Sequence, residues 1–184
     1  MAIALGLLND RPATIVETGI SCRGTDSTRL FDSYVRSFGG EFWSVDIDPE
    51  VVNGVRSEVG ARTELRCDDS VHFLSRWVRD HHGERADLVY LDSFDVDFAD
   101  PWPAAEHCLH EFEAIRPALR PGSLLLIDDS PGAIADVPEA YREAGQEIHD
   151  ECGFFPGKGM LVEARLEELG VEKLHHWYQA LYRF

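Results

Sequence analysis

Short apolar runs that stop on carboxylates constrain the fold of this chain more than any other feature. ADLVYLD ends at Asp92, and GSLLLIDD ends at Asp128 and Asp129. Runs this short and this rich in Leu, Val and Ile are typical of strands buried on both faces of a parallel sheet. Ligands of open α/β sheets bind outside the carboxyl ends of such strands. The pattern therefore predicts three acidic side chains at the binding edge of a sheet.

Strand and helix signals alternate along most of the chain, which predicts βαβ units and a mostly parallel sheet. The expected strands are 13–17, 42–46, 62–67, 87–92 and 122–128, and the expected helices are 27–38, 49–59, 70–82, 103–116, 136–144 and 160–170. The final HHWYQALYRF has strand composition and is expected to join the sheet at or near an edge. The expected fold is a single α/β domain over residues 1–184, doubly wound and Rossmann-like.

The charge and composition of the chain indicate which kinds of ligand and which cellular location to expect. The net charge of −17 argues against binding a nucleic-acid backbone and suits a cationic small ligand. No apolar run approaches the roughly 20 residues that cross a membrane, and MAIALGLLND has no basic region of a signal peptide, so a cytoplasmic location is expected. The four cysteines lack metal-site spacing and are expected to be reduced thiols.

A glycine-containing loop follows the first expected strand. The strand ends at Glu17 and continues into Gly19, Ser21 and Gly24 before a helix begins. The glycines allow a tight turn and close approach of the backbone to a ligand. Ser21 takes the middle position of a G-x-G-x-x-G spacing, so a dinucleotide site remains a competing interpretation. Any α/β protein can also turn on glycine without binding a ligand.

Acidic residues follow the next two strands. Asp46 ends the second strand and can accept hydrogen bonds from both hydroxyls of a ribose. Asp48 precedes Pro49 and is expected to cap a helix. Asp69 and Ser70 follow the third strand, where either can cap the next helix or contact the edge of a purine.

The carboxylates that end the two later strands suggest a cation. Three converging carboxylates repel one another and resist ionisation unless a cation lies between them. Mg²⁺ prefers oxygen ligands and retains water that a substrate can displace. The alternative is that 129–132, with sequence DSPG, only forms a turn.

Taken in order, these motifs resemble the class I S-adenosylmethionine-dependent methyltransferases. The resemblance covers about residues 13–130: E-T-G-x-S-x-x-G, SVDID, DDSVHFL, DLVYLDS and LRPGSLLLIDDS. It implies a cofactor site that includes Glu17, Gly19, Ser21, Gly24, Asp46, Asp69, Ser70 and Asp92. Within the class, the chain is similar to metal-dependent O-methyltransferases of the catechol, caffeoyl-CoA and macrocin types. That similarity implies Mg²⁺ on Asp92, Asp128 and Asp129, and a metal-free methyltransferase remains an alternative.

Several residues depart from the catechol-type pattern. Asp95 stands where those enzymes carry a lysine base, so Asp95 and His107 are the candidate bases. The alternatives are that Asp95 is a surface loop residue and that His107 is a structural residue of its helix. Lys158, one of only two lysines, lies between two glycines and is expected to pair with Asp129 or contact an anionic substrate, unless the segment is a surface turn. The N-terminal helices that cover the catechol-type site are expected to be missing here or reduced to MAIALGLLNDR.

The expected function is therefore Mg²⁺-assisted O-methylation of a small hydroxylated metabolite with S-adenosylmethionine. An NAD-dependent oxidoreductase remains an alternative, and so does a non-catalytic module that binds the cofactor. The aromatic terminal strand could pair with a second copy of the chain, so a homo-oligomer is possible.

Overall fold

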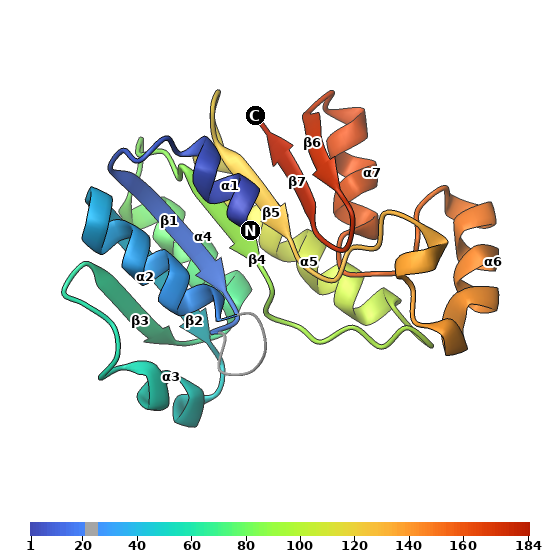
Figure 1. The fold of residues 1–184 in the computed structure, drawn as a ribbon, viewed down its shortest axis with the longest axis horizontal. Coiled ribbons are helices and arrows are strands. Elements are labelled where there is room, and N and C mark those ends of the chain that lie inside the picture. The colour runs from blue at the N-terminus through green and yellow to red at the C-terminus, as the bar shows by residue number, and fades with distance from the viewer. Residues whose placement is uncertain (21–25) are drawn as a thin grey trace.

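The computed structural model describes residues 1–20 and 26–184, and in this part of the chain seven strands form one sheet in the order β3-β2-β1-β4-β5-β7-β6 (Figure 1). Strands β1 to β5 are mutually parallel, and β7 runs antiparallel to both β5 and β6. The strands are β1 (Ala13–Thr18), β2 (Gly40–Asp46), β3 (Thr63–Cys67), β4 (Leu88–Leu91), β5 (Leu124–Ile127), β6 (Glu172–His176) and β7 (Ala180–Arg183). The expected doubly wound, mostly parallel α/β fold is confirmed.

Helices cover both faces of the sheet (Figure 1). They are α1 (Ala2–Leu7), α2 (Ser27–Phe38), α3 (Pro49–Val55), α4 (Ser70–Asp80), α5 (Trp102–Ile115), α6 (Arg142–Cys152) and α7 (Met160–Glu168). One face packs on α4, α5 and α7, and the other packs on α1 and α2. Every residue of β4 and β5 is buried, as expected for strands that face two layers of helices.

Alternate side chains of β5 pack in the two hydrophobic cores on opposite faces of the sheet. Leu125 and Ile127 pack with Phe112 of α5, whereas Leu124 and Leu126 pack on the face that carries α1 and α2. Successive side chains of a strand point to opposite faces, so an unbroken apolar run is what this position requires. The two faces together bury the run completely.

The C-terminal part of the chain differs from the sequence prediction. The end of the chain is not one strand, because His175 and His176 belong to β6 and the chain reverses before β7. β7 lies one strand in from the edge, between β5 and β6, which confirms the expected position near an edge. Instead of a helix over 136–144, two short 3₁₀ turns precede α6. The N-terminal segment forms α1, which packs on the sheet through Ala4.

No helix in the described part of the chain is both long enough and apolar enough to span a membrane.

Candidate active site

The carboxyl ends of β1, β2, β4 and β5 meet at one edge of the sheet, at the point where the strand order reverses between β1 and β4. Gly19 follows β1 with a φ of +81°, and a Cβ atom there would lie 2.2 Å from the carbonyl oxygen of Asp92. Only glycine fits this contact without displacing the backbone. The loops after β1 and β4 are therefore packed directly against each other.

Glu17 is fully buried near the end of β1, and its carboxylate lies in the protein interior. Its oxygens accept hydrogen bonds from the hydroxyls of Ser27 at 2.6 Å, Thr28 at 2.8 Å and Ser44 at 2.6 Å. Burial raises the pKa of Glu17 from 4.5 to about 7, although the three hydroxyl donors oppose this shift. Through these hydrogen bonds Glu17 ties α2 to β1 and β2, and its expected contact with the cofactor stays a prediction.

A cavity of about 310 Å³ opens above the ends of β1 and β2. Gly19, Asp46, Asp69 and Ser70 line it, so the sequence prediction placed four residues at one site. The carboxylate of Asp46 accepts the backbone N–H of Ile20 at 3.0 Å and that of Asp48 at 2.8 Å, which fixes its orientation. Of the other expected cofactor residues, Ser21 and Gly24 lie outside the described part of the chain.

Both helix caps that the sequence predicts are present. The side chain of Asp48 accepts the backbone N–H of Glu50 at 2.8 Å, and that of Asp69 accepts the backbone N–H of His72 at 2.8 Å. Capping satisfies backbone donors at the start of α3 and α4. It also holds Asp69 at the wall of the cavity.

His107 belongs to the wall of the same cavity. Its Nε2 lies 2.9 Å from the hydroxyl of Ser70 and 3.1 Å from that of Ser93, and Ser93 donates to Glu111 at 2.7 Å. Hydrogen bonding to Glu111 raises the pKa of His107, although partial burial opposes this. The sequence did not indicate Ser93 or Glu111. The network ties α5 to the start of α4 and to the segment after β4, and both partners of Nε2 of His107 are side chains of the protein.

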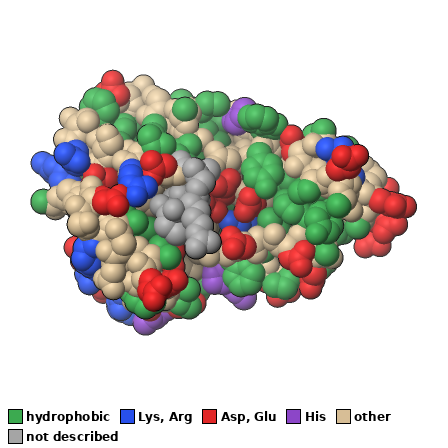
Figure 2. Space-filling model, turned by 60° about the horizontal axis from the view of Figure 1, so that its bottom comes forward, with side chains coloured by type: hydrophobic (Ala, Val, Ile, Leu, Met, Phe, Trp, Pro, Cys, Tyr) green, Lys and Arg blue, Asp and Glu red, His purple; other side chains and the backbone are tan. Residues whose placement is uncertain are grey.

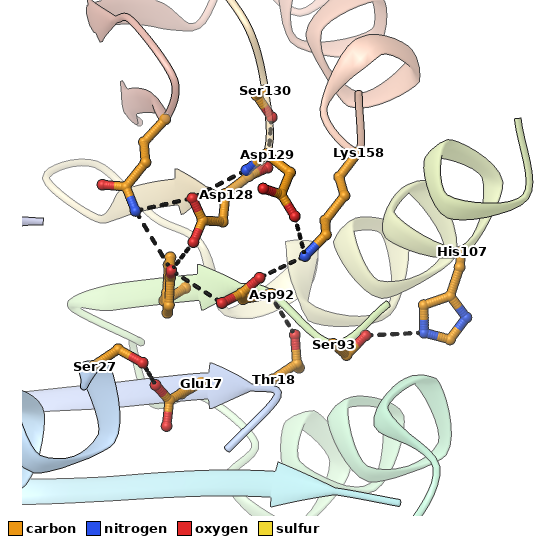
Figure 3. Close-up of polar contacts among 12 residues, drawn as sticks. Glu17, Thr18, Ser27, Asp92, Ser93, His107, Asp128, Asp129, Ser130 and Lys158 are labelled. Atoms are coloured by element: carbon orange, nitrogen blue, oxygen red, sulfur yellow. Dashed lines mark hydrogen bonds and ion pairs between the residues drawn. The ribbon is translucent and has the colours of Figure 1, made fainter. Parts of the chain in front are cut away.

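Lys158 reaches the edge of the sheet from the turn before α7 (Figure 3). Its Nζ lies 2.5 Å from Oδ1 of Asp92 and 3.0 Å from Oδ2 of Asp129. Asp129 has a φ of +42°, a conformation that aspartate tolerates better than most residues. The lysine side chain is 3% exposed, so the pairing expected between Lys158 and Asp129 is present and buried.

The pKa values of the pair reflect burial and mutual charge. Burial raises the pKa of Asp92 to about 7, Lys158 opposes that shift and Asp128 adds to it. Burial alone would lower the pKa of Lys158, but Asp92 and Asp129 raise it above its ordinary value. Lys158 is therefore a cation at neutral pH, and in this state it cannot accept a proton.

Asp128 is directed away from Lys158 (Figure 3). The hydroxyl of Tyr90 donates to Oδ2 of Asp128, and Nε2 of Gln179 donates to Oδ1 at 3.1 Å. The same tyrosine hydroxyl lies 3.2 Å from Oδ2 of Asp92. Burial raises the pKa of Tyr90, and the neighbouring carboxylates add to this, so Tyr90 remains a neutral donor. Both carboxylate oxygens of Asp128 are thus occupied by neutral groups.

The arrangement does not fit the expected Mg²⁺ site on Asp92, Asp128 and Asp129. Lys158 already bridges two of these carboxylates, and the third is turned to Tyr90 and Gln179. Within the described residues, the three ligand-bearing side chains whose atoms gather within 4.8 Å are instead Glu41, His81 and Glu84. Glu41 lies near the start of β2, at the opposite end of the strand from Asp46.

Asp95 does not join the site. Asp95 is exposed in the loop after β4, and it is not among the residues that line the cavity near Asp46. An aspartate four residues beyond a strand end can lie either over the site or beside it, depending on the conformation of the loop. Among residues 1–20 and 26–184, no contact makes Asp95 a base.

A second and larger cavity, of about 720 Å³, lies on the other side of the carboxylates. Its walls are mainly apolar and come from α1, α2, β5, β7 and the turn between β6 and β7; they include Ile3, Leu30, Leu126, Trp177, Tyr178 and Leu181. Asp128 and Asp129 border it. In Figure 2, acidic side chains surround a basic side chain near the centre of the view, beside a patch of hydrophobic side chains.

Comparison with known proteins identifies the family. Residues 16–130 match the family described as methyltransferase domain, which is more than half of the chain. The chain belongs to this family. The matched segment runs from β1 to the residue after Asp129, so it contains all the strand ends described above. No curated protein sequence matches the chain.

Solved structures share the fold of this methyltransferase domain at low sequence identity. The calicheamicin methyltransferase CalS11 has a TM-score of 0.65 at 14% identity, over 100% of this chain and 76% of that one. A putative methyltransferase from Thermobifida fusca has a TM-score of 0.58 at 14% identity, over 99% and 79%. LepI in complex with SAM has a TM-score of 0.56 at 13% identity, over 96% and 45%.

Proposed function

We propose that this methyltransferase domain transfers a methyl group from S-adenosylmethionine to an oxygen of a small, partly apolar metabolite. The observation that carries the proposal is the pair of cavities on either side of the paired carboxylates at the sheet edge. One has the residues that a nucleoside requires, and the other has apolar walls with a polar border. Ligand sites at the switch point of α/β sheets have this character.

The smaller cavity suits the nucleoside part of the cofactor. Asp46 is held by two backbone N–H groups and can accept hydrogen bonds from ribose hydroxyls. Asp69 and Ser70 line the same wall and can meet a purine. The cofactor supplies an electrophilic methyl group on a sulfonium cation, and the acidic edge of the sheet is complementary to that charge.

The larger cavity suits the methyl acceptor. Its apolar side chains can bury the body of a small molecule, and Asp128 and Asp129 border its inner end. Both oxygens of Asp128 accept hydrogen bonds from Tyr90 and Gln179, whereas Asp129 pairs with Lys158 and with the hydroxyl of Tyr178, which itself lines this cavity. We assign Asp129 the acceptance of the hydroxyl proton of the acceptor. His107 lines the nucleoside cavity instead, where it positions Ser70 and Ser93.

Oxygen as the acceptor atom is supported by a structural relative. An apo structure of CalS11 is described as a TDP-rhamnose 3'-O-methyltransferase, and it has a TM-score of 0.58 at 17% identity over 100% of this chain and 76% of that one. Another protein of the same fold, at a TM-score of 0.55 and 15% identity over 96% of this chain and 45% of that one, is described as a pericyclic reaction enzyme. The fold alone therefore does not determine methyl transfer, and turnover must be measured.

The test is calorimetric titration of S-adenosylhomocysteine and of NAD into the wild type and Asp46→Asn. We expect micromolar binding of S-adenosylhomocysteine, about −8 kcal/mol, that is weakened in the variant, and no binding of NAD. Transfer of radiolabelled methyl to a panel of phenols, sugars and hydroxy acids then measures turnover. Binding of NAD in place of S-adenosylhomocysteine would favour an oxidoreductase. Cofactor binding without transfer to any hydroxylated compound would favour a non-catalytic module.

A further inference from the structure

Lys158 is the feature that the family pattern leaves unexplained. It is one of two lysines in 184 residues, and it is 2% exposed. Its ammonium group lies between Asp92 and Asp129, at 2.5 Å and 3.0 Å. A divalent cation at this position would have its oxygen ligands at about 2.0–2.6 Å. Two cations cannot occupy that space together.

The turn that carries Lys158 is fitted closely to the end of β5. A Cβ atom on Gly157 would lie 2.3 Å from the carbonyl oxygen of Asp129, and one on Gly159 would lie 2.4 Å from the hydroxyl of Ser130. The backbone N–H of Lys158 donates to the same carbonyl of Asp129 at 2.9 Å. Backbone contacts therefore fix the origin of the lysine side chain, and its position does not depend on the ion pair alone.

The charges require a cation at this point. Two carboxylates taken out of water repel each other, and burying them without a partner costs several kcal/mol for each ion. Lys158 supplies that partner from within the chain. An ammonium group has three protons to donate, and Asp92 and Asp129 take two. In the described part of the chain the third proton has no protein acceptor.

We propose that the ammonium group of Lys158 takes the place of the divalent cation between Asp92 and Asp129, so that the site operates without a resident metal. This rests on the proposed function, because it assigns the third N–H of Lys158 to the acceptor oxygen. The fixed charge keeps Asp129 oriented towards the acceptor and stabilises negative charge that develops on that oxygen. The proposal replaces the Mg²⁺ assistance that the sequence pattern indicates.

The test counts bound Mn²⁺ by electron paramagnetic resonance in the wild type, Asp129→Asn, Lys158→Met and the double variant. Asparagine tolerates the left-handed conformation of residue 129, and methionine keeps the length of lysine without its charge. We expect the wild type and Asp129→Asn to bind equal numbers of Mn²⁺. We expect Lys158→Met to bind one more ion than the double variant, because removal of the ammonium opens the site.

A wild type that binds one Mn²⁺ more than Asp129→Asn would overturn the proposal, and so would a folded Lys158→Met that takes up no additional ion. If Lys158→Met does not fold, the comparison of wild type with Asp129→Asn still decides. Lys173→Met is the matched control, since Lys173 also pairs with a buried carboxylate, Glu163 at 3.1 Å, and we expect no change in Mn²⁺ count.

Binding of S-adenosylhomocysteine, measured with and without excess EDTA on the same samples, separates this proposal from the proposed function. Absence of binding in both conditions would contradict the cofactor assignment. Binding that is unchanged by EDTA, together with equal Mn²⁺ counts, supports both. Once an acceptor is known, methyl transfer by the wild type should change less than twofold in EDTA, whereas a loss of tenfold or more that Mg²⁺ restores would overturn the proposal.

Discussion

The buried carboxyl of Glu17 predicts that the stability of the protein falls as pH rises from acid to neutral. In the folded protein its pKa is raised to about 7, chiefly by burial, and in the unfolded chain it returns to an ordinary value near 4.5. Below pH 4.5 the group is protonated in both states and has no effect. Between the two values the folded protein retains a proton that the unfolded chain releases, so the free energy of unfolding decreases as pH increases.

The size of the effect follows from the difference of the two pKa values. Each pKa unit corresponds to about 1.4 kcal/mol, so a shift from 4.5 to about 7 sets an upper limit of about 3 kcal/mol between pH 4 and pH 8. The three hydroxyls around Glu17 favour its ionised form and are already included in the shift. Glu17→Gln removes the titrating proton and keeps the shape of the side chain. The variant should therefore gain stability relative to the wild type as pH increases.

The assay is urea unfolding of the wild type and Glu17→Gln at intervals between pH 4.5 and pH 8. Asp92 titrates in the same range in both proteins, so the greater part of its contribution cancels in the difference, and the effect of its charge on Glu17 is already included in the raised pKa of Glu17. Ser44→Ala is the matched control: it removes one donor to the carboxylate, and we expect the wild-type decrease to extend to higher pH. A difference between wild type and Glu17→Gln that stays constant over this range would refute the reasoning.

Three further predictions concern the turn, the cofactor and the acceptor. Gly157→Ala should lower the free energy of unfolding by about 1–3 kcal/mol, because the added methyl would lie 2.3 Å from a backbone oxygen; Gly54→Ala, with nothing within 4 Å, should be neutral or stabilising in the same urea titration. Asp46→Ala should lower the affinity of the protein for S-adenosylhomocysteine by about 10- to 100-fold in calorimetry, as expected for losing hydrogen bonds to a charged group. Trp177→Ala should raise the KM of the acceptor more than it lowers kcat, since Trp177 is 66% exposed and lines the larger cavity but not the one near Asp46; an equal effect on both constants would contradict its assignment as a binding residue.

Strand ends could be predicted from the sequence because local patterns determine them. The apolar runs before Asp92 and Asp128 specify buried parallel strands, and parallel strands deliver their carboxyl ends to one edge. Asp46 follows from the same rule, and the caps at Asp48 and Asp69 follow from residue type and position. These predictions need no knowledge of contacts between distant parts of the chain.

Apart from the expected pairing of Lys158 with Asp129, the partners of the carboxylates could not be predicted, because they come from distant segments. Lys158 is 66 residues from Asp92, and its position depends on the fit of Gly157 against the end of β5. Gln179 reaches Asp128 only because the chain reverses between β6 and β7, and no periodicity marks that reversal. Identical acidic strand ends can therefore serve a metal or an ammonium, and the sequence alone cannot tell which.

The charge balance at this edge makes a last prediction about the cofactor. Asp92 has a pKa of about 7, so near neutral pH a substantial fraction of the protein holds it protonated. A bound cation close to Asp92 favours its ionised form, because opposite charges stabilise each other more strongly away from water. S-adenosylmethionine carries a sulfonium cation, whereas S-adenosylhomocysteine has a neutral thioether in its place. Only the first should bind more tightly as pH rises through 7.

The measurement is calorimetric titration of both ligands at pH 6 and pH 8. We expect the affinity for S-adenosylmethionine to increase several-fold at pH 8 relative to that for S-adenosylhomocysteine, with about tenfold as the limit for a pKa change of one unit. The amino and carboxyl groups that the two ligands share cancel in the ratio. Asp92→Asn cannot titrate and should give the same ratio at both pH values. A wild-type ratio that does not change with pH would mean that the sulfonium lies away from Asp92, and would place the methyl group elsewhere than between the two cavities.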